Sequence, residues 1–167
     1  MPDVSTYRYP RAAVTGDFLR AGIGLAMTAG PALAIPASSP AQFVLAPLAL
    51  LFLAFGVRTW LRSVAVIAVT ARDISLSAPW QARLAWSNLK GVKLNYYSTR
   101  FDRSGGWMQL LLKGAGGPDG ATIRLDSTVE GFSEIARQAA SAARAAQVPM
   151  SEATKNNFSA LGIAVDD

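Results

Sequence analysis

The stretch VIAVTARDISLSAPWQARLAWSNLKGVKL, Val66 to Leu94, alternates apolar and polar residues in several short runs. An alternation with period two is typical of half-buried β-strands. The first two strand candidates, 64–70 and 73–77, follow each other closely enough to form a hairpin. Further candidates lie at 82–86, 92–98, 107–113 and 122–126. The pattern therefore predicts a small antiparallel β-domain.

An amphipathic helix is expected directly after these strands, in STVEGFSEIARQAASAARAAQ, residues 127–147. Ser127 or Thr128 can cap its first turn. One face collects the apolar residues Phe132, Ile135, Ala136, Ala139 and Ala143. We predict an α+β unit over residues 63–147, in which this helix caps a small antiparallel β-barrel.

The chain from Ala21 to Val57 contains no charged residue. This run is longer than the roughly 20 residues that one membrane-spanning helix needs. Two prolines and two serines in IPASSPAQ, Ile35 to Gln42, interrupt it and favour a turn. We predict an N-terminal tail over residues 1–16 and a two-helix transmembrane hairpin over residues 17–62, with helices at about 18–35 and 41–61.

Basic residues flank the predicted hairpin and are missing from its loop: Arg8, Arg11 and Arg20 precede it, and Arg58 and Arg62 follow it. Positive charge favours the cytoplasmic side of a membrane. We therefore expect a multi-pass protein of the bacterial inner membrane with both termini in the cytoplasm. The alternative is a cleaved signal peptide ending at the ALA of residues 32–34, which would leave one anchor and an external domain.

Small residues recur at four-residue spacing in the first predicted helix, at Gly22, Ala26 and Gly30. This spacing lets two helix backbones approach closely in a membrane. The face either packs against the second helix of the hairpin or docks onto another membrane protein.

Several residues of the β-domain resemble a known pattern. Trp86 precedes the polar turn Ser87-Asn88-Leu89, a basic strand follows, and the closing helix carries Gly131, Phe132, Glu134 and Ile135. Over residues 64–140 the chain resembles the bacterial pleckstrin-homology-like (PH-like) domains of small membrane-anchored proteins. The resemblance implies a fold and a membrane location, whereas function depends on the sites that a fold carries. Trp86 itself is interpreted as a core or rim aromatic, with a ligand platform as the alternative.

The composition argues against catalysis. The chain has neither Cys nor His, which excludes a disulfide framework and a thiolate metal site and removes the usual general base. A Ser or Thr nucleophile would need Lys or a carboxylate as its base, and no lysine stands in a recognisable motif. The glycines between Gly114 and Gly120 are interpreted as a loop because no Lys-Ser/Thr follows them. We predict no enzymatic activity, no metal and no cofactor.

The net charge of +5 is concentrated near the predicted anchor, since residues 58–113 hold nine basic groups against two acidic ones. The candidate contacts for anionic lipid are Arg58, Arg62, Lys90, Lys93, Arg100 and Arg103. Each basic residue near an anionic leaflet contributes about 1 kcal/mol. The alternative is that these charges are simply solvated and set the topology. Nucleic-acid binding is not expected because no recognition motif appears.

The C-terminal segment 148–167 is a second candidate contact. Ser151 can cap a short helix in which Phe158 and Leu161 lie one turn apart. This helix either folds back on the barrel or docks a partner.

Together these features predict a non-catalytic PH-like module, anchored in the inner membrane, that scaffolds or regulates a membrane protein complex at the cytoplasmic face. The alternative is a peripheral module that binds anionic lipid through the basic band. The expected partners are membrane lipids and another membrane protein or complex.

Overall fold

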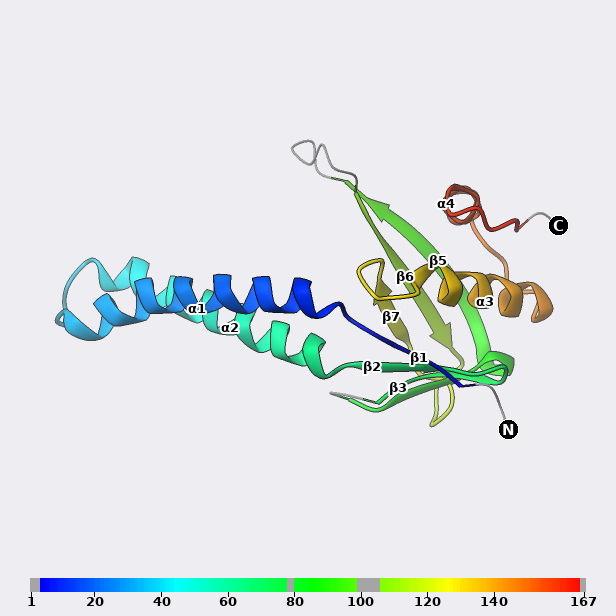
Figure 1. Ribbon diagram of the computed structural model, residues 1–167, viewed down its shortest axis with the longest axis horizontal. Helices are drawn as coiled ribbons and strands as arrows, with labels where there is room; N and C mark the ends of the chain where they lie inside the picture. The colour runs from blue at the N-terminus through cyan, green and yellow to red at the C-terminus, as the bar shows by residue number, and fades with distance from the viewer. Residues whose placement is uncertain (1–3, 78–79, 99–105, 166–167) are drawn as a thin grey trace. The chain divides into compact units, whose positions relative to one another are not determined.

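The computed structural model describes residues 4–77, 80–98 and 106–165 (Figure 1). The chain divides into two compact units. The sheet unit comprises Met1–Arg8 and Val66–Asp167, and the helical unit comprises Tyr9–Ala65. The sheet unit is therefore assembled from segments on both sides of the helical unit in the sequence.

The first sheet of the sheet unit is antiparallel, with the strand order β1-β2-β3-β4. Its strands are β1 (Ser5–Arg8), β2 (Val66–Val69), β3 (Asp73–Leu76) and β4 (Ala82–Ala85). In the β1–β2 pair, Ser5 lies opposite Val69 and Arg8 lies opposite Val66. β1 falls within the segment predicted as an N-terminal tail. Only Tyr7 of this strand is even half-buried, so its sequence shows no apolar alternation.

The second sheet has the order β5-β6-β7 and is also antiparallel. Its strands are β5 (Leu89–Tyr97), β6 (Trp107–Gly114) and β7 (Ile123–Asp126), and the short 3-10 helix η1 (Trp86–Asn88) leads into β5. Inward-facing side chains of these strands are almost completely buried: Val92, Leu94, Leu110, Leu112, Ile123 and Leu125. This sheet therefore supplies much of the apolar core.

Helix α3 (Phe132–Ala145) packs against β5 and η1 with an apolar face (Figure 1). The face predicted from the sequence is confirmed, since Phe132, Ile135, Ala136, Ala139 and Ala143 are all buried. The predicted start of the helix is wrong. Gly131 precedes the helix with a φ of 68°, and the ring of Tyr7 occupies the place where a Cβ would lie. This left-handed residue separates the helix from Ser127 and Thr128.

The strands do not form the predicted closed barrel. Among the described residues, the two sheets are joined by an isolated bridge between Leu84 of β4 and Gly120. Two backbone bonds flank it, from Ala85 N to Asp119 O and from Ala121 N to Arg83 O. β4 is only 4 residues long and passes at once into η1, so no continuous ladder closes the structure. The fold is α+β with two small open sheets.

The helical unit consists of α1 (Arg11–Ala34) and α2 (Gln42–Val64), which pack against each other. Ala21 and Thr28 of α1 and Thr59 of α2 are buried. The hydroxyls of Thr28 and Thr59 donate to Gly24 O at 2.7 Å and to Phe55 O at 2.9 Å. These polar groups are therefore satisfied within their own helices.

The predicted two-helix transmembrane hairpin is also wrong. Within the described part of the chain, α2 alone is long and apolar enough to cross a membrane. α1 carries Arg11, Asp17 and Arg20, so its uncharged part is Ala21–Ala34. At 1.5 Å per residue this part is about 21 Å long, against a hydrocarbon core of about 30 Å. A multi-pass topology is not supported.

Candidate membrane-contacting surfaces

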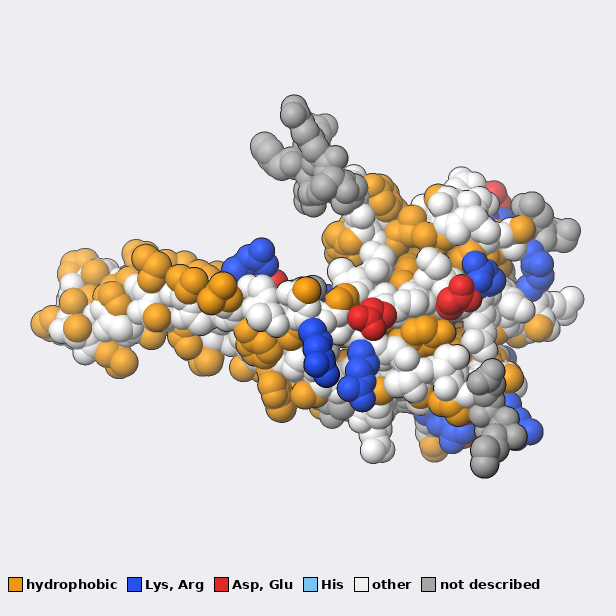
Figure 2. Space-filling model, viewed as in Figure 1, with side chains coloured by type: hydrophobic (Ala, Val, Ile, Leu, Met, Phe, Trp, Pro, Cys, Tyr) orange, Lys and Arg blue, Asp and Glu red, His pale blue; other side chains and the backbone are white. Residues whose placement is uncertain are grey.

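The exterior of α2 is almost entirely apolar and uncovered. Only 6% of its most apolar 18-residue window is buried. Its exposed large side chains are Phe43, Val44, Leu48, Leu50, Leu51, Leu53, Val57 and Trp60. Figure 2 shows hydrophobic side chains, in orange, along most of the visible face of the helical unit. A core helix of a soluble protein would bury such a surface, whereas lipid can cover it.

The predicted small-residue face is not the face that joins the two helices. Gly22, Ala26 and Gly30 are exposed, and a Cβ added to Gly22 or Gly30 would meet nothing within 4 Å. A Cβ on Gly24, in contrast, would overlap the ring of Phe52. The face of α1 that packs against α2 runs through Ala21, Gly24 and Thr28. Gly22, Ala26 and Gly30 lie outside this contact.

Charged side chains of both helices meet at one end of the helical unit. The carboxylate of Asp17 lies 3.0 Å from Arg20 and 3.8 Å from Arg62. The guanidinium of Arg62 also lies over the ring of Tyr9, 4.7 Å from its centroid. Arg58 is exposed one turn before Arg62 on α2. The helical unit thus has a charged end that continues into an apolar body.

The predicted basic band is divided between the two units and a segment that lies outside the described residues. Lys90 and Lys93 are exposed on β5 of the sheet unit. Arg58 and Arg62 belong to the helical unit. Arg100 and Arg103 lie outside the described residues. The two lysines therefore share β5, and the two arginines share α2.

The outer face of the second sheet is a surface that the sequence analysis missed. Leu94 of β5 points into the core, so the neighbouring positions in the pleat point the other way. We define the outer face by Lys93, Tyr97, Trp107, Lys113 and Arg124. The rings of Tyr97 and Trp107 stack with centroids 4.7 Å apart and an interplanar angle of 24°. Each of these two residues is 43% exposed.

The period-two alternation in VKLNYYS and WMQLLLK could have predicted this face, because the alternation places the buried leucines on one side of the strand and the lysines and aromatics on the other. The alternation does not give the register between the strands. Tyr97 lies opposite Trp107, and Lys93 lies opposite Leu111, which in turn lies opposite Arg124. The pairing of three strands places these side chains on one surface.

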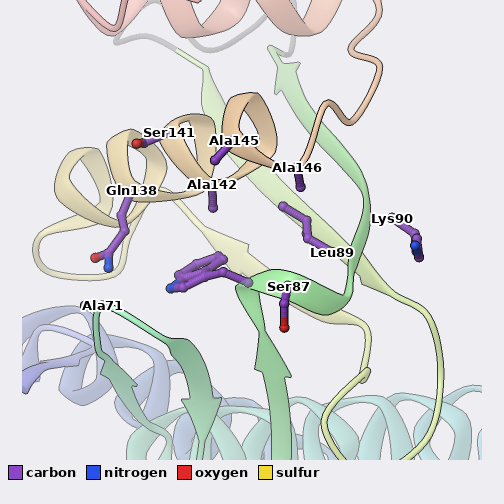
Figure 3. A pocket seen from close by; sticks show the side chains of 10 residues that line it. Ala71, Ser87, Leu89, Lys90, Gln138, Ser141, Ala142, Ala145 and Ala146 are labelled. Atoms are coloured by element: carbon purple, nitrogen blue, oxygen red, sulfur yellow. The ribbon is translucent and has the colours of Figure 1, made fainter.

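A groove of about 620 Å³ runs between η1 and α3 (Figure 3). Trp86 lines it but is only 8% exposed, and its indole Nε1 donates to Thr70 O at 3.0 Å. Gln138 of α3 donates to the same carbonyl at 2.7 Å. Lys90 is the one charged residue among the described residues of the lining, and it extends away from α3 in Figure 3. Trp86 is therefore a core residue, as we predicted from the sequence.

An ion pair links β3 to β4 in the first sheet. Asp73 accepts hydrogen bonds from Arg83 Nε at 3.0 Å and from the Thr70 hydroxyl at 3.0 Å. The hydrogen bond from Arg83 is the main cause that lowers the pKa of Asp73, and burial of the carboxylate opposes it. Asp73 raises the pKa of Arg83 in return. No group of three or more Asp or Glu side chains within the described ranges could hold a metal ion.

The C-terminal helix α4 (Glu152–Ala160) lies against β5 (Figure 1). Ser151 caps it by accepting from Thr154 N at 3.3 Å. Phe158 is completely buried, and Asn157 donates to Leu94 O at 2.6 Å. Leu161 is half-buried at the end of the helix. Of the two interpretations of this segment, the structure shows the one in which it folds back on its own domain.

Comparisons with protein-family models, with curated proteins and with solved structures find no match for the chain. The resemblance to PH-like domain proteins therefore stays a prediction.

Proposed function

We propose that the protein is a non-catalytic accessory module, held in the membrane by its helical unit, whose sheet unit scaffolds or regulates a membrane protein complex at the cytoplasmic face. The observation that carries the proposal is the uncovered apolar exterior of α2. An exposed surface of this extent would drive aggregation in water.

The basic residues favour the cytoplasmic side of the membrane for the proposed module. Arg11 and Arg20 lie in the first part of α1, and Arg58 and Arg62 lie in the last part of α2. Positive charge near membrane-embedded segments is retained in the cytoplasm. This supports a cytoplasmic location for the charged end of the helical unit, where Arg20 and Arg62 meet Asp17.

Membrane attachment is tested with Leu51→Arg, which places a charge in the middle of α2 where Leu51 is 61% exposed. A central arginine costs about 3 kcal/mol on insertion scales. We expect wild type to resist alkaline carbonate extraction and Leu51→Arg to be released. Ser63→Arg is the matched control, because Ser63 is exposed beside Arg62 at the charged end, and it should behave like wild type. Release of the wild-type protein by carbonate would contradict the proposal.

The accessory role is tested by mild detergent extraction of the full-length protein from its native membranes, followed by sizing and mass spectrometry. We expect a stoichiometric companion membrane protein. A Gly22→Leu, Gly30→Leu double variant should reduce its recovery if the exposed small-residue face makes the contact. Recovery of the protein with lipid alone would count against a scaffolding role.

The second candidate function is the binding of anionic lipid by the sheet unit. The exposure of Lys90 and Lys93 on β5 favours it. In this case the membrane itself, and not a protein complex, is the partner of the sheet unit.

A further inference from the structure

We propose that the outer face of the second sheet is a distinct membrane contact, which lies against the headgroups of an anionic bilayer with the Tyr97–Trp107 pair at the interface. The inference rests on the proposed membrane attachment and adds the surface and the lipid class that the sheet unit recognises.

The aromatic pair has the chemistry of an interfacial anchor. Tyr and Trp gather at membrane–water boundaries because each combines an apolar ring with a polar group. Tyr97 and Trp107 pair at the end of the β5–β6 ladder, and their stacked rings present a rigid, half-exposed surface. A stacked pair also loses little conformational freedom on binding, because it is already ordered.

The cations of the same face select an anionic surface. Lys93, Lys113 and Arg124 are exposed, and none of them forms a salt bridge with another described residue. The described acid on this side of the sheet is Asp126, which accepts a hydrogen bond from Gln109 at 3.3 Å. The surplus of positive charge is therefore available to phosphate groups.

The charge pattern also favours lipid over a second copy of the chain. A symmetric contact through this face would bring the positively charged face of one protomer, with Lys93, Lys113 and Arg124, against the same face of the other. Such a contact repels itself, whereas a sheet of anionic headgroups attracts all three cations at once.

Four tryptophans allow a direct test, because each reports on a different place. Trp60 is exposed on α2, Trp80 is 72% exposed outside the outer face, Trp86 is buried and Trp107 lies on the outer face. Each variant keeps Trp86 and one other tryptophan, with the remaining two changed to phenylalanine. The full-length chain is reconstituted into vesicles of phosphatidylethanolamine and phosphatidylglycerol, whose acyl chains are brominated near the headgroup.

We expect bromine to quench Trp107 fluorescence strongly and Trp80 fluorescence weakly. Quenching of Trp107 should fall in phosphatidylcholine vesicles and in a Lys93→Gln, Lys113→Gln, Arg124→Gln variant. Three cations at about 1 kcal/mol each correspond to a docking equilibrium shifted by about a hundredfold. Far-UV circular dichroism confirms that the triple variant is folded.

The outcomes separate this inference from the proposed function. An unquenched Trp60 means that α2 is not in lipid, and the proposed attachment fails. A quenched Trp60 with an unquenched Trp107 leaves the attachment standing and overturns the inference. Equal quenching of Trp80 and Trp107, or quenching of Trp107 that ignores headgroup charge, overturns it as well, because no specific anionic contact then exists.

Discussion

Asp73 holds two neighbouring strands together through one side chain. It lies on β3, and its carboxylate binds Arg83 of β4 while it also accepts from Thr70 in the turn before β3. Asp73 is buried and Arg83 is mostly exposed. A carboxylate in this position depends on its donors, since a buried charge without partners is strongly unfavourable.

At this scale we predict that Asp73→Asn lowers the free energy of unfolding by about 2 kcal/mol, because it replaces hydrogen bonds to a charged acceptor. The folded pKa of Asp73 lies below its ordinary value. Its contribution is therefore complete above the unfolded pKa of about 3.9 and is lost as the pH falls through the folded pKa. Thermal melts from pH 7 to pH 2 should show this acid-dependent loss in wild type and a reduced loss in the variant.

The control for this prediction is Asp119→Asn. Asp119 is 52% exposed in its side chain and lies 3.6 Å from Arg83. An exposed pair of this kind contributes less than about 1 kcal/mol. Equal losses for the two variants would contradict the special role of Asp73.

A second residue-scale prediction concerns Phe158, which is completely buried where α4 meets the sheet unit. Phe158→Ala should cost about 3–5 kcal/mol, as the removal of a large core side chain does. Leu161→Ala, at a half-buried position, should cost distinctly less. Thermal melts of the full chain in mild detergent measure both. A loss of stability much smaller than this for Phe158→Ala would instead favour the alternative that α4 docks a partner.

At the scale of the element, the contact between α1 and α2 depends on one close approach. Gly24 has no room for a side chain beside Phe52, whereas Gly22 faces open space. The chain has no cysteine, so introduced cysteines can report on this contact without interference. A Cβ on Gly56 would lie 3.6 Å from the Cβ of Ala21, within the range that a disulfide requires.

We therefore predict that Ala21→Cys with Gly56→Cys forms a disulfide readily under mild oxidation, as measured by loss of maleimide labelling. Adding Gly24→Val should suppress the cross-link because the valine overlaps Phe52. Adding Gly22→Val should leave it unchanged. If Gly22→Val suppressed the cross-link instead, the two helices would pack through the face of small residues predicted from the sequence.

Most individual strands could be predicted from the sequence, whereas the pairing of distant strands could not. Period-two patterns located most strands, because burial of one face leaves a local trace. β1 left no such trace, since STYR has just one half-buried residue. The closure of a barrel depends on pairing between distant strands, which periodicity does not report. The outer face could not be predicted for the same reason, because it depends on the register between β5, β6 and β7.

At the scale of the whole molecule, the β1–β2 pair restricts how the chain can meet a membrane. β1 directly precedes the helical unit and β2 directly follows it. Hydrogen bonds between paired strands cannot form across a bilayer. Under the proposed attachment, the pair can persist only with both ends of the helical unit on one side. A crossing by α2 alone, the one described helix that is long and apolar enough to cross, would separate the two strands.

We predict that Ser5→Cys on β1 and Ser141→Cys on α3, both exposed, react with a membrane-impermeant maleimide from the same side. Inverted and right-side-out vesicles provide the two sides, and the cysteine-free wild type is the blank. Labelling of the two positions from opposite sides would mean that β1 does not pair with β2 in the membrane-bound protein.

The same pairing sets an order of assembly during synthesis. β1 leaves the ribosome before the other described strands, but its partner β2 follows only after the whole helical unit has been made. Until then β1 has no ladder to join. An unpaired edge of β2 would be open to strands of other chains. A chain in which β1 fails to reach β2 would keep this edge open and would therefore be prone to aggregate.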